Sequence, residues 1–366
     1  MKEKRTIKLF LAMAVCFGLL VTCLNQQNAY AESKVIRLKF AFYPPAKSNF
    51  GILFQKFGTD LEQRTNGRVK VDFYGGGSLL GAPQVYEGIV SGITDMAYSH
   101  IEYTAGRFPV TAARQLPLGY PSGWVANQVA NDFHNEFQMK EWDEVKVLWM
   151  HACPPTVFIT TKPVRKLEDL HGLIIRAPGM VGEIVKALGA TPAPTPVMEV
   201  YDAMSKGVIQ GVNIPFESNF SFRFADVAKY ITESWPIGNV YAFYIAMNKN
   251  SYNKLPDDIK LILEKLSGEY REEVALMWNS SDFLGKDYAI EKNVEIISLP
   301  PIEMKRWQNV ANGVIDEYVK NMTSKGYPEA EVRGWIKYLR ERIDYWTKMQ
   351  IELHIPAVTG PPEMRQ

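Results

Sequence analysis

Apolar and polar residues alternate in short stretches through the first third of the chain, and helix-period stretches separate them. Ile36, Leu38, Phe40 and Phe42 fall on one face of an extended segment, which is typical of a strand. In order, the patterns predict a strand over 35–42, a helix over 50–61, a strand over 68–74, a helix over 82–90 and a strand over 92–99. This alternation predicts a mostly parallel sheet sandwiched by helices.

The same rhythm resumes after Pro121 and predicts a second α/β unit. Its predicted elements are strands over 145–150, 173–176 and 208–213, helices over 181–188 and 199–206, a long amphipathic helix from 256 to 286, a strand over 294–299 and a last amphipathic helix that includes Trp335 and Trp346. Two α/β units in series predict two lobes with a cleft between them. Ligands in such sheets bind beyond the carboxyl ends of the strands.

Residues 1–31 have the organisation of a secretory signal peptide. A basic segment precedes an apolar run from Leu9 to Leu24, and Ala29-Tyr30-Ala31 is a cleavage signal. The run is shorter than the roughly 20 residues that a membrane-spanning helix needs. Cleavage after Ala31 is therefore expected, with lipidation of Cys23 as the alternative. Either route predicts export.

Charge and cysteine content narrow the function classes. The chain has 41 Lys and Arg and 40 Asp and Glu, and residues 1–31 contain four of the cations and one of the anions, so the remainder is close to neutral. This balance argues against nucleic acid or an anionic membrane as partner. Beyond residue 31, Cys153 stands alone, so we expect no internal disulfide. The remaining length is sufficient for two domains.

Motifs for catalysis or a bound cofactor are weak in this sequence. The glycine-rich segment 75–81 follows a predicted strand, but its spacing differs from that of dinucleotide-binding loops and is typical of a tight turn. His151 and Cys153 could form a nucleophile pair, yet no orienting acid is evident, and a buried Cys153 is the alternative. The five histidines lack metal-ligand spacing. We therefore expect neither catalytic residues nor a cofactor or metal.

Arg176 is the strongest candidate for ligand binding. It ends the apolar strand that begins at Leu173 and precedes Pro178 and a predicted helix. A guanidinium at this point would face a cleft, where its planar fork suits a carboxylate in bidentate contact. The alternative is a salt bridge at the surface or between domains.

Other strand ends supply further polar and aromatic candidates. Segment 210–217 turns abruptly polar after a strand, so Asn213 either faces the cleft or forms an Asx turn. Tyr43 after the first strand either lines a pocket or caps the sheet. The complete set of candidate ligand-binding residues is Arg176, Asn213, Glu217, Phe216, Tyr43, His100, His151 and Pro178.

Several segments together resemble the solute receptors of TRAP transporters, the tripartite ATP-independent periplasmic systems (the DctP family). The matching segments are 65–71 (TNGRVKV), 75–81 (GGGSLLG), 92–96 (GITDM), 169–176 (DLHGLIIR), 188–192 (LGATP) and 199–211 (EVYDAMSKGVIQG). They agree with the family in order and spacing from about residue 36 to 260. Arg176 matches the arginine that pairs with the substrate carboxylate in that family.

The resemblance implies a type II periplasmic-binding-protein-like α/β fold. Two lobes would enclose a ligand cleft, joined by crossing strands and a long interdomain helix. The implied divisions are 1–31 (signal peptide), 32–152 (first part of lobe I), 153–239 (first part of lobe II), 240–285 (return to lobe I and the crossing helix) and 286–366 (C-terminal strand and helices that pack on the lobes). The implied activity is non-catalytic capture of a small organic carboxylate in the periplasm, for delivery to the TRAP membrane permease subunits.

Departures from the family pattern bear on the ligand. Some members carry a second substrate arginine around the position of Thr156, and the usual aspartate is replaced by Gln210. Fewer charges around the ligand favour a monocarboxylate with an apolar or aromatic body over a dicarboxylate or sialic acid. A secreted enzyme acting on a small acid and a ligand-sensing receptor for a membrane signalling partner are the alternative functions. We expect a monomer.

Overall fold

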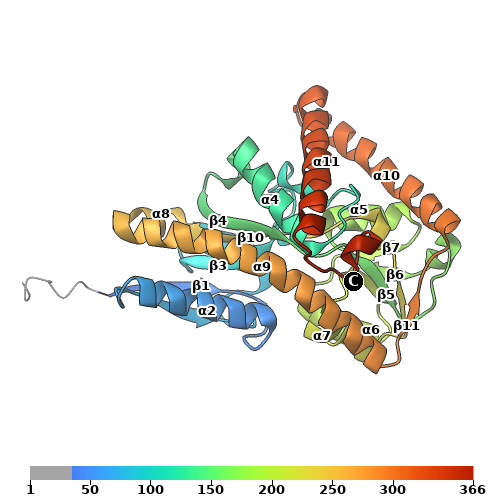
Figure 1. The fold of residues 1–366 in the computed structure, drawn as a ribbon, viewed down its shortest axis with the longest axis horizontal. Coiled ribbons are helices and arrows are strands. Elements are labelled where there is room, and N and C mark those ends of the chain that lie inside the picture. Colours follow the sequence, from blue (N-terminus) through green and yellow to red (C-terminus); the bar gives the residue numbers. More distant parts are fainter. Residues whose placement is uncertain (1–34, 366) are drawn as a thin grey trace, which may run out of the picture.

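The computed structural model describes residues 35–365 and contains two β-sheets with helices packed around them (Figure 1). The predicted signal peptide lies outside the described residues. The first sheet has the order β2-β1-β3-β10-β4 and the second the order β11-β9-β5-β8-β6-β7. The strands are β1 (Ile36–Ala41), β2 (Val69–Tyr74), β3 (Met96–His100), β4 (Val145–Ala152), β5 (Val157–Thr160), β6 (Ile174–Arg176), β7 (Thr191–Ala193), β8 (Gly211–Ile214), β9 (Tyr230–Thr232), β10 (Ala242–Asn248) and β11 (Glu295–Ile297).

The helices carry the apolar faces that the sequence indicates. They are α2 (Asn49–Arg64), α3 (Val85–Val90), α4 (Gly123–Phe137), α5 (Gly179–Ala187), α6 (Val200–Ser205), α7 (Ser218–Ser221), α8 (Lys249–Asn253), α9 (Asp257–Glu291), α10 (Pro301–Ser324) and α11 (Glu329–Glu352). In α2, for example, Phe54, Phe57 and Leu61 are fully buried, and Ser48 caps the start by accepting a hydrogen bond from the Gly51 amide.

Within residues 35–365, each sheet contains a single strand that runs against the others. Strand β10 is antiparallel to β3 and β4 in the first sheet, and β5 is antiparallel to β8 and β9 in the second. These are the strands that the chain forms after the two short extended segments that pass from the other sheet, whereas β11, which follows the passage along the long helix α9, is parallel to β9. The pattern-based expectation of mostly parallel sheets therefore holds except at β5 and β10.

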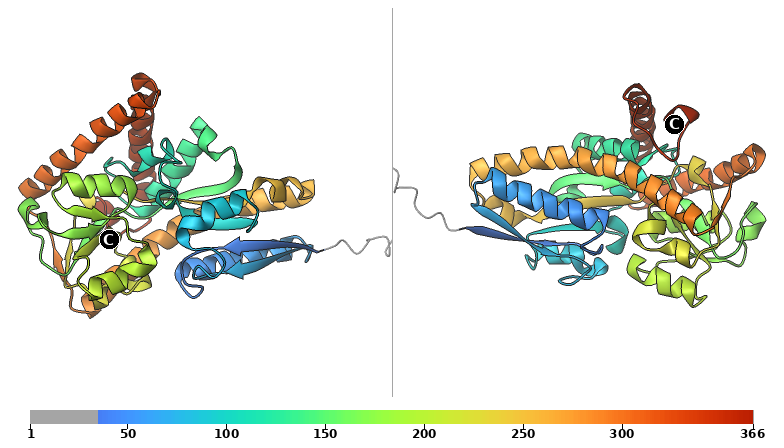
Figure 2. Two further views of the ribbon diagram at one scale, coloured as in Figure 1. Left: turned by 180° about the vertical axis from the view of Figure 1, so that it is seen from behind. Right: turned by 60° about the horizontal axis from the view of Figure 1, so that its bottom comes forward.

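The chain passes between the sheets by two short extended segments and one long helix. Residues 153–156 and 239–241 lie side by side, because the Cys153 amide donates to Tyr241 O (3.2 Å) and the Thr156 amide to Asn239 O (3.1 Å). We call this pair of segments the crossing ribbon. The 35-residue α9 packs on α2 and α4 at one end and on α7 at the other, and Figure 2 shows it running along both lobes.

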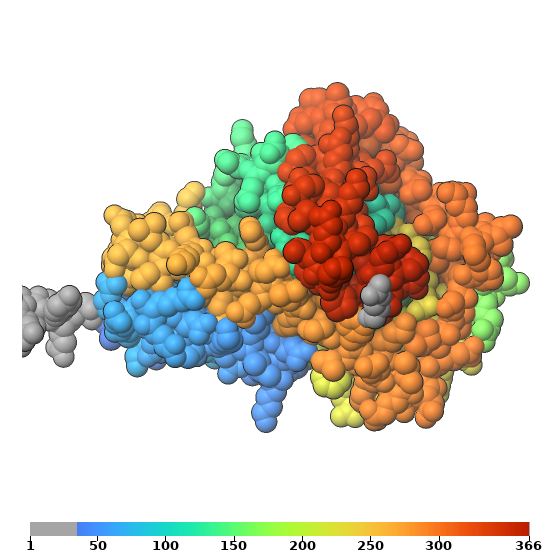
Figure 3. Space-filling model, viewed as in Figure 1, coloured from blue at the N-terminus to red at the C-terminus, as the bar shows by residue number. Residues whose placement is uncertain are grey.

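The C-terminal helices cover the outside of the junction. Helix α11 packs on α4, and α10 packs on α5 (Figure 3 shows α11 in front of the molecule, with the C-terminal residues beside it). Thr359 adds a hydrogen bond from its hydroxyl to Pro121 O (2.7 Å) just before α4. No helix within residues 35–365 has both the length and the apolar composition needed to cross a bilayer. The predicted fold, two α/β lobes joined by crossing strands and a long helix, is confirmed.

Candidate functional site

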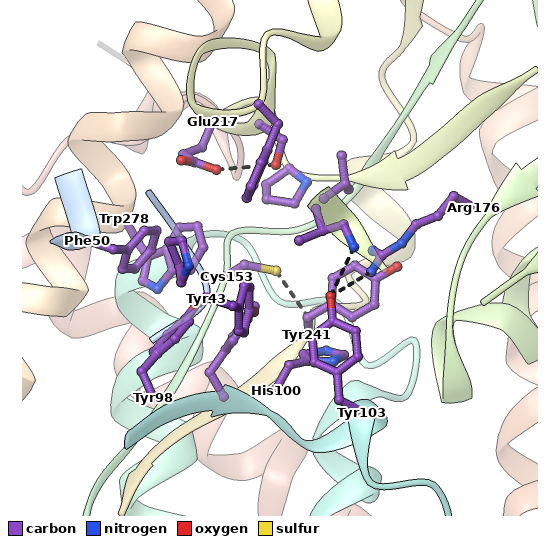
Figure 4. A pocket seen from close by; sticks show the side chains of 17 residues that line it. Tyr43, Phe50, Tyr98, His100, Tyr103, Cys153, Arg176, Glu217, Tyr241 and Trp278 are labelled. Atoms are coloured by element: carbon purple, nitrogen blue, oxygen red, sulfur yellow. Dashed lines mark hydrogen bonds between the residues drawn. The ribbon is translucent and has the colours of Figure 1, made fainter. Parts of the chain in front are cut away.

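A cavity that is partly open to solvent lies between the two sheets beside the crossing ribbon, and it encloses about 450 Å³ of non-atom space when the solvent at its mouth is included (Figure 4). Its wall comes from strand ends of both sheets, from the crossing ribbon and from α2 and α9. The lining residues are Tyr43, Pro44, Phe50, Tyr98, His100, Tyr103, Cys153, Arg176, Val197, Ile214, Pro215, Glu217, Ser218, Phe222, Tyr241, Phe243 and Trp278. The cavity thus occupies the place where ligands of open α/β sheets bind.

Arg176 is the last residue of β6 and turns into this cavity. Its side chain is held in place by hydrogen bonds from Nε to Thr195 O (2.9 Å) and from Nη2 to the Tyr103 hydroxyl (3.4 Å). The guanidinium carbon lies 5.6 Å from the centre of the Tyr241 ring. These contacts orient the guanidinium and leave part of its donor fork directed at the cavity.

The charge of Arg176 is uncompensated by the described part of the protein. The residue is 3% exposed, and no carboxylate oxygen of residues 35–365 lies within 4.0 Å of its guanidinium. A buried cation without a partner is destabilising, because it has lost its hydration without gaining an ion pair. An anion in the cavity would supply the missing partner. The alternative of a salt bridge between domains is not realised among these residues.

Aromatic rings form most of the wall around this cation. The Tyr98 and Phe243 rings are stacked with centres 5.6 Å apart, and the Phe50 and Trp278 rings meet edge to face at 4.7 Å. The Tyr43 ring packs on Tyr98 at 5.2 Å. Because these side chains are already packed against each other, they offer a preformed apolar surface to the body of a ligand.

Two further polar side chains in the wall have atoms without a hydrogen-bond partner among the described residues. Both ring nitrogens of His100 are unpartnered, and burial together with the nearby Arg176 charge holds the pKa of His100 well below its usual value. His100 is therefore a neutral imidazole with one donor and one acceptor. Glu217 has an unpartnered Oε1, and burial raises the pKa of its carboxyl to about 7.

The chemistry of Cys153 and His151 does not support a nucleophile pair. Burial raises the pKa of the Cys153 thiol far above its usual value, and its sulfur accepts a hydrogen bond from the Tyr241 amide (3.1 Å). The His151 Nδ1 accepts from Trp278 Nε1 (3.1 Å), and burial lowers the pKa of this imidazole as well. A neutral thiol without a base is a poor nucleophile.

The structure brings four of the eight candidate residues together: Arg176, Glu217, Tyr43 and His100 all line the cavity. The other four lie outside the lining. Asn213 does not line the cavity, and its Oδ1 instead accepts a hydrogen bond from the Thr156 hydroxyl (2.6 Å). The register explains this position: Arg176 is opposite Val212, so Asn213 projects from the other face of β8.

The remaining three candidates are buried or capping residues. Phe216 is fully buried, with Lys286 Nζ 5.3 Å above its ring. His151 is covered by the Tyr98 and Phe243 rings, whose centres lie 5.3 and 5.0 Å from its own. Pro178 precedes the first turn of α5 as its N-terminal cap residue.

Sequence reasoning missed Tyr103, Tyr241, Trp278, Phe50 and Tyr98 as site residues. Tyr98 and Trp278 lie within a predicted strand and a predicted helix, where an apolar side chain indicates core rather than cavity wall. The segment around Tyr103 directly follows the strand end at His100, which is the only local signal that could have indicated it.

Direct contacts between the lobes close one side of the cavity. Tyr103 follows β3 of the first sheet, yet its hydroxyl accepts from the Val197 amide (3.2 Å) and from Arg176 of the other lobe. The neighbouring Glu102 accepts a hydrogen bond from the Met180 amide in the first turn of α5 (3.3 Å). Gly179 (φ 57°) allows this approach, because a Cβ at that position would collide with the Glu102 carboxylate.

A two-lobed α/β architecture with a cavity at the junction, lined by a buried guanidinium, is typical of solute-binding proteins. Residues 40–321 match the family model of bacterial extracellular solute-binding proteins, family 7 (DctP). The chain belongs to this family, whose members include the TRAP periplasmic solute-binding proteins to which it is similar in structure.

Three solved structures illustrate the similarity. The chain is 34% identical to a TRAP periplasmic solute-binding protein from Desulfovibrio salexigens, an open complex with the C-terminus of a symmetry mate in its ligand-binding site (83% of this chain and 95% of that chain, TM-score 0.72). It is 26% identical to one from Rhodoferax ferrireducens in complex with copurified benzoate (86% and 99%, TM-score 0.80). It is 25% identical to a marine metagenome protein specific for aromatic acid ligands, in complex with 3-hydroxybenzoate (85% and 99%, TM-score 0.80).

Proposed function

We propose that this protein is the periplasmic receptor of a TRAP transporter and captures a small monocarboxylate with an aromatic or apolar body. Arg176 binds the carboxylate, and the aromatic wall contacts the rest of the ligand. The observation that carries this proposal is a buried guanidinium that lacks a carboxylate partner among the described residues and faces a cavity lined by aromatic rings.

The polarity of the cavity supports one carboxylate rather than two. Arg114 is also buried, but it is not among the cavity residues, so Arg176 is the arginine that the described lining supplies. A second carboxylate on the ligand would lie near Glu217 or the aromatic rings, where no cation of the lining compensates it. The benzoate and 3-hydroxybenzoate complexes of the two similar proteins agree with an aromatic monocarboxylate.

In this mechanism the ligand binds the closed arrangement of the lobes in preference to the open one. Closure excludes water from around Arg176, which strengthens its contact with the carboxylate because the local dielectric falls. The ligand therefore shifts the open–closed equilibrium, and the closed surface is presented to the membrane permease. The receptor performs no chemistry on the ligand.

A calorimetric screen of the purified protein against small acids tests the proposal. The panel pairs each aromatic monocarboxylate with its uncharged amide, for example benzoate with benzamide, and includes succinate as a dianion. We expect binding of at least one aromatic acid and none of its amide. High affinity confined to dianions such as succinate would show that the proposed ligand class is wrong. Mass spectrometry of the ligand after release would reveal any enzymatic turnover.

A further inference from the structure

Glu217 lies in the wall of the same cavity as Arg176 but on its other side (Figure 4). It follows β8 by three residues and immediately precedes α7, and its side chain is 2% exposed. An acidic side chain in a wall made largely of aromatic rings is unfavourable unless it has a polar partner. The contacts of Glu217 therefore indicate which ligand group this side of the cavity can bind.

One oxygen of this carboxyl group is satisfied within the protein and the other is not. Oε2 accepts a hydrogen bond from the Ser218 hydroxyl (3.2 Å), whereas Oε1 accepts none among residues 35–365, although the Ser221 hydroxyl is near enough to lower the pKa of this carboxyl against the effect of burial. Buried polar atoms in native proteins are nearly always hydrogen-bonded, and leaving one unpaired is destabilising. Oε1 is thus a buried acceptor in the wall that no described residue satisfies.

The backbone at Glu217 is held in place, so the side chain cannot easily move into solvent to satisfy the unpaired Oε1. The Glu217 amide donates to Asp282 Oδ1 of α9 (2.9 Å). At Gly285, one turn further along α9, an added Cβ would lie 2.0 Å from Phe216 O, which shows how closely the helix packs on this segment. Helix α9 therefore holds Glu217 at the cavity.

We propose that Glu217 is a specificity-determining residue that binds a hydroxyl group on the body of the ligand, away from its carboxylate. This proposal rests on the proposed function, in which Arg176 binds the carboxylate. A hydroxyl both donates and accepts, so it matches Glu217 whether the carboxyl is ionised or protonated. An ammonium matches only the ionised form, and an ether or carbonyl only the protonated form.

The side chains around Glu217 offer a ligand hydroxyl few other hydrogen-bond partners. Phe50 and Trp278 belong to the same wall and pack edge to face, and the nearby Ser218 hydroxyl already donates to Oε2. A ligand hydroxyl that lost Glu217 would lie among aromatic rings and would have the neutral Ser218 hydroxyl in place of the carboxyl as its nearby polar group. The preferred substrates are accordingly hydroxylated aromatic acids rather than unsubstituted ones.

The test compares matched ligands on matched variants by calorimetry. The ligands are benzoate, phenylacetate and the 3-hydroxy, 4-hydroxy, 3-aminomethyl and 3-methoxy derivatives of each, the aminomethyl group being an ammonium at neutral pH. The proteins are the wild type, Glu217→Gln and Glu217→Leu. We expect the wild type to bind one hydroxylated acid about tenfold more tightly than its parent, since hydrogen bonds to charged groups have this magnitude. Glu217→Leu should remove most of that ratio, and Glu217→Gln should retain part of it.

The outcomes separate this inference from the proposed function. An unchanged hydroxyl-to-parent ratio in Glu217→Leu overturns the role of Glu217, as does a preference for the aminomethyl or methoxy derivative over the hydroxyl in the wild type. If no aromatic acid binds the wild type, the proposed function itself fails. Should Glu217→Leu not fold by circular dichroism, Glu217→Gln and the methoxy comparison decide the question on folded protein.

Discussion

Replacing Arg176 by methionine should weaken ligand binding while leaving the ligand-free protein no less stable. Methionine keeps much of the length and the apolar stem of arginine but removes the charge and the fork. Charged hydrogen bonds contribute about 1.5–3 kcal/mol each, so losing two of them to a carboxylate costs at least roughly 3 kcal/mol. That corresponds to about a 100-fold rise in Kd.

The stability of the ligand-free variant follows from the burial of Arg176. The residue is 3% exposed, and its neutral contacts are Thr195 O and the Tyr103 hydroxyl, so its desolvated charge is poorly compensated before ligand binds. Removing an uncompensated buried charge is neutral or stabilising when the replacement packs well. Affinity and stability should therefore change in different directions, which a mutation that merely damages the fold would not produce. Arg176→Lys keeps the charge but loses the planar fork, so its Kd should lie between those of the wild type and Arg176→Met.

Arg114 provides the matched control. It is 2% exposed, its Nε and Nη1 have no partner among the described residues, and burial lowers its pKa to about 10, yet it is not part of the cavity wall. Arg114→Met should leave the Kd within about twofold of the wild type. Calorimetry with an acid identified in the screen measures both variants, and thermal unfolding without ligand gives their stabilities. An Arg176→Met protein that binds as tightly as the wild type would refute the reasoning.

Three further predictions concern other buried groups. Burial raises the pKa of Asp282 to about 8 in the folded protein, whereas its pKa in the unfolded chain is near 4. The protonated carboxyl is therefore compatible with the fold, and stability is lost as the pH rises from about 4 through 8. In urea unfolding, Asp282→Asn should be more stable than the wild type at pH 8 and equally stable near pH 4. Glu102→Gln removes the charge that meets the first turn of α5 and should raise the Kd about threefold through easier opening, with ligand-free stability unchanged. With ligand bound, Cys153 should not react with a thiol reagent, whereas it should react fully in denaturant, and labelling of the ligand-bound protein would contradict its burial.

The sequence predicted the elements whose two faces differ. Strand β1 and helices α2 and α9 each have a buried side and a solvent side, so their apolar residues repeat with the period of the element. Strands β5 and β10 are buried at every residue and were not predicted, whereas the equally buried β3 and β8 were predicted, each directly after a predicted helix. A fully buried strand has no polar face and hence no alternation to detect.

At the candidate site, too, the sequence indicated only the residues that have a local pattern. Arg176 and Glu217 were indicated by local pattern, since each is a charged residue beside an apolar strand. Tyr103 and Tyr241 belong to segments far apart in sequence, and they meet Arg176 only because the lobes fold together. Asn213 was expected in the cleft, but the alternation of β8 directs it to the opposite face from Val212, and only the register of β8 on β6 reveals this.

The crossing ribbon constrains how the two lobes can move. It continues the pairing of β4 with β10, in which Ala242 is opposite Ala152, into the segments that carry Cys153 and Tyr241. A narrow two-stranded ribbon bends most readily perpendicular to its own plane, while sliding one strand past the other would break its hydrogen bonds. Relative motion of the lobes should therefore have essentially one direction, a bend at the ribbon. Since Cys153 and Tyr241 also line the cavity, a ligand in contact with them lies on the axis of that bend.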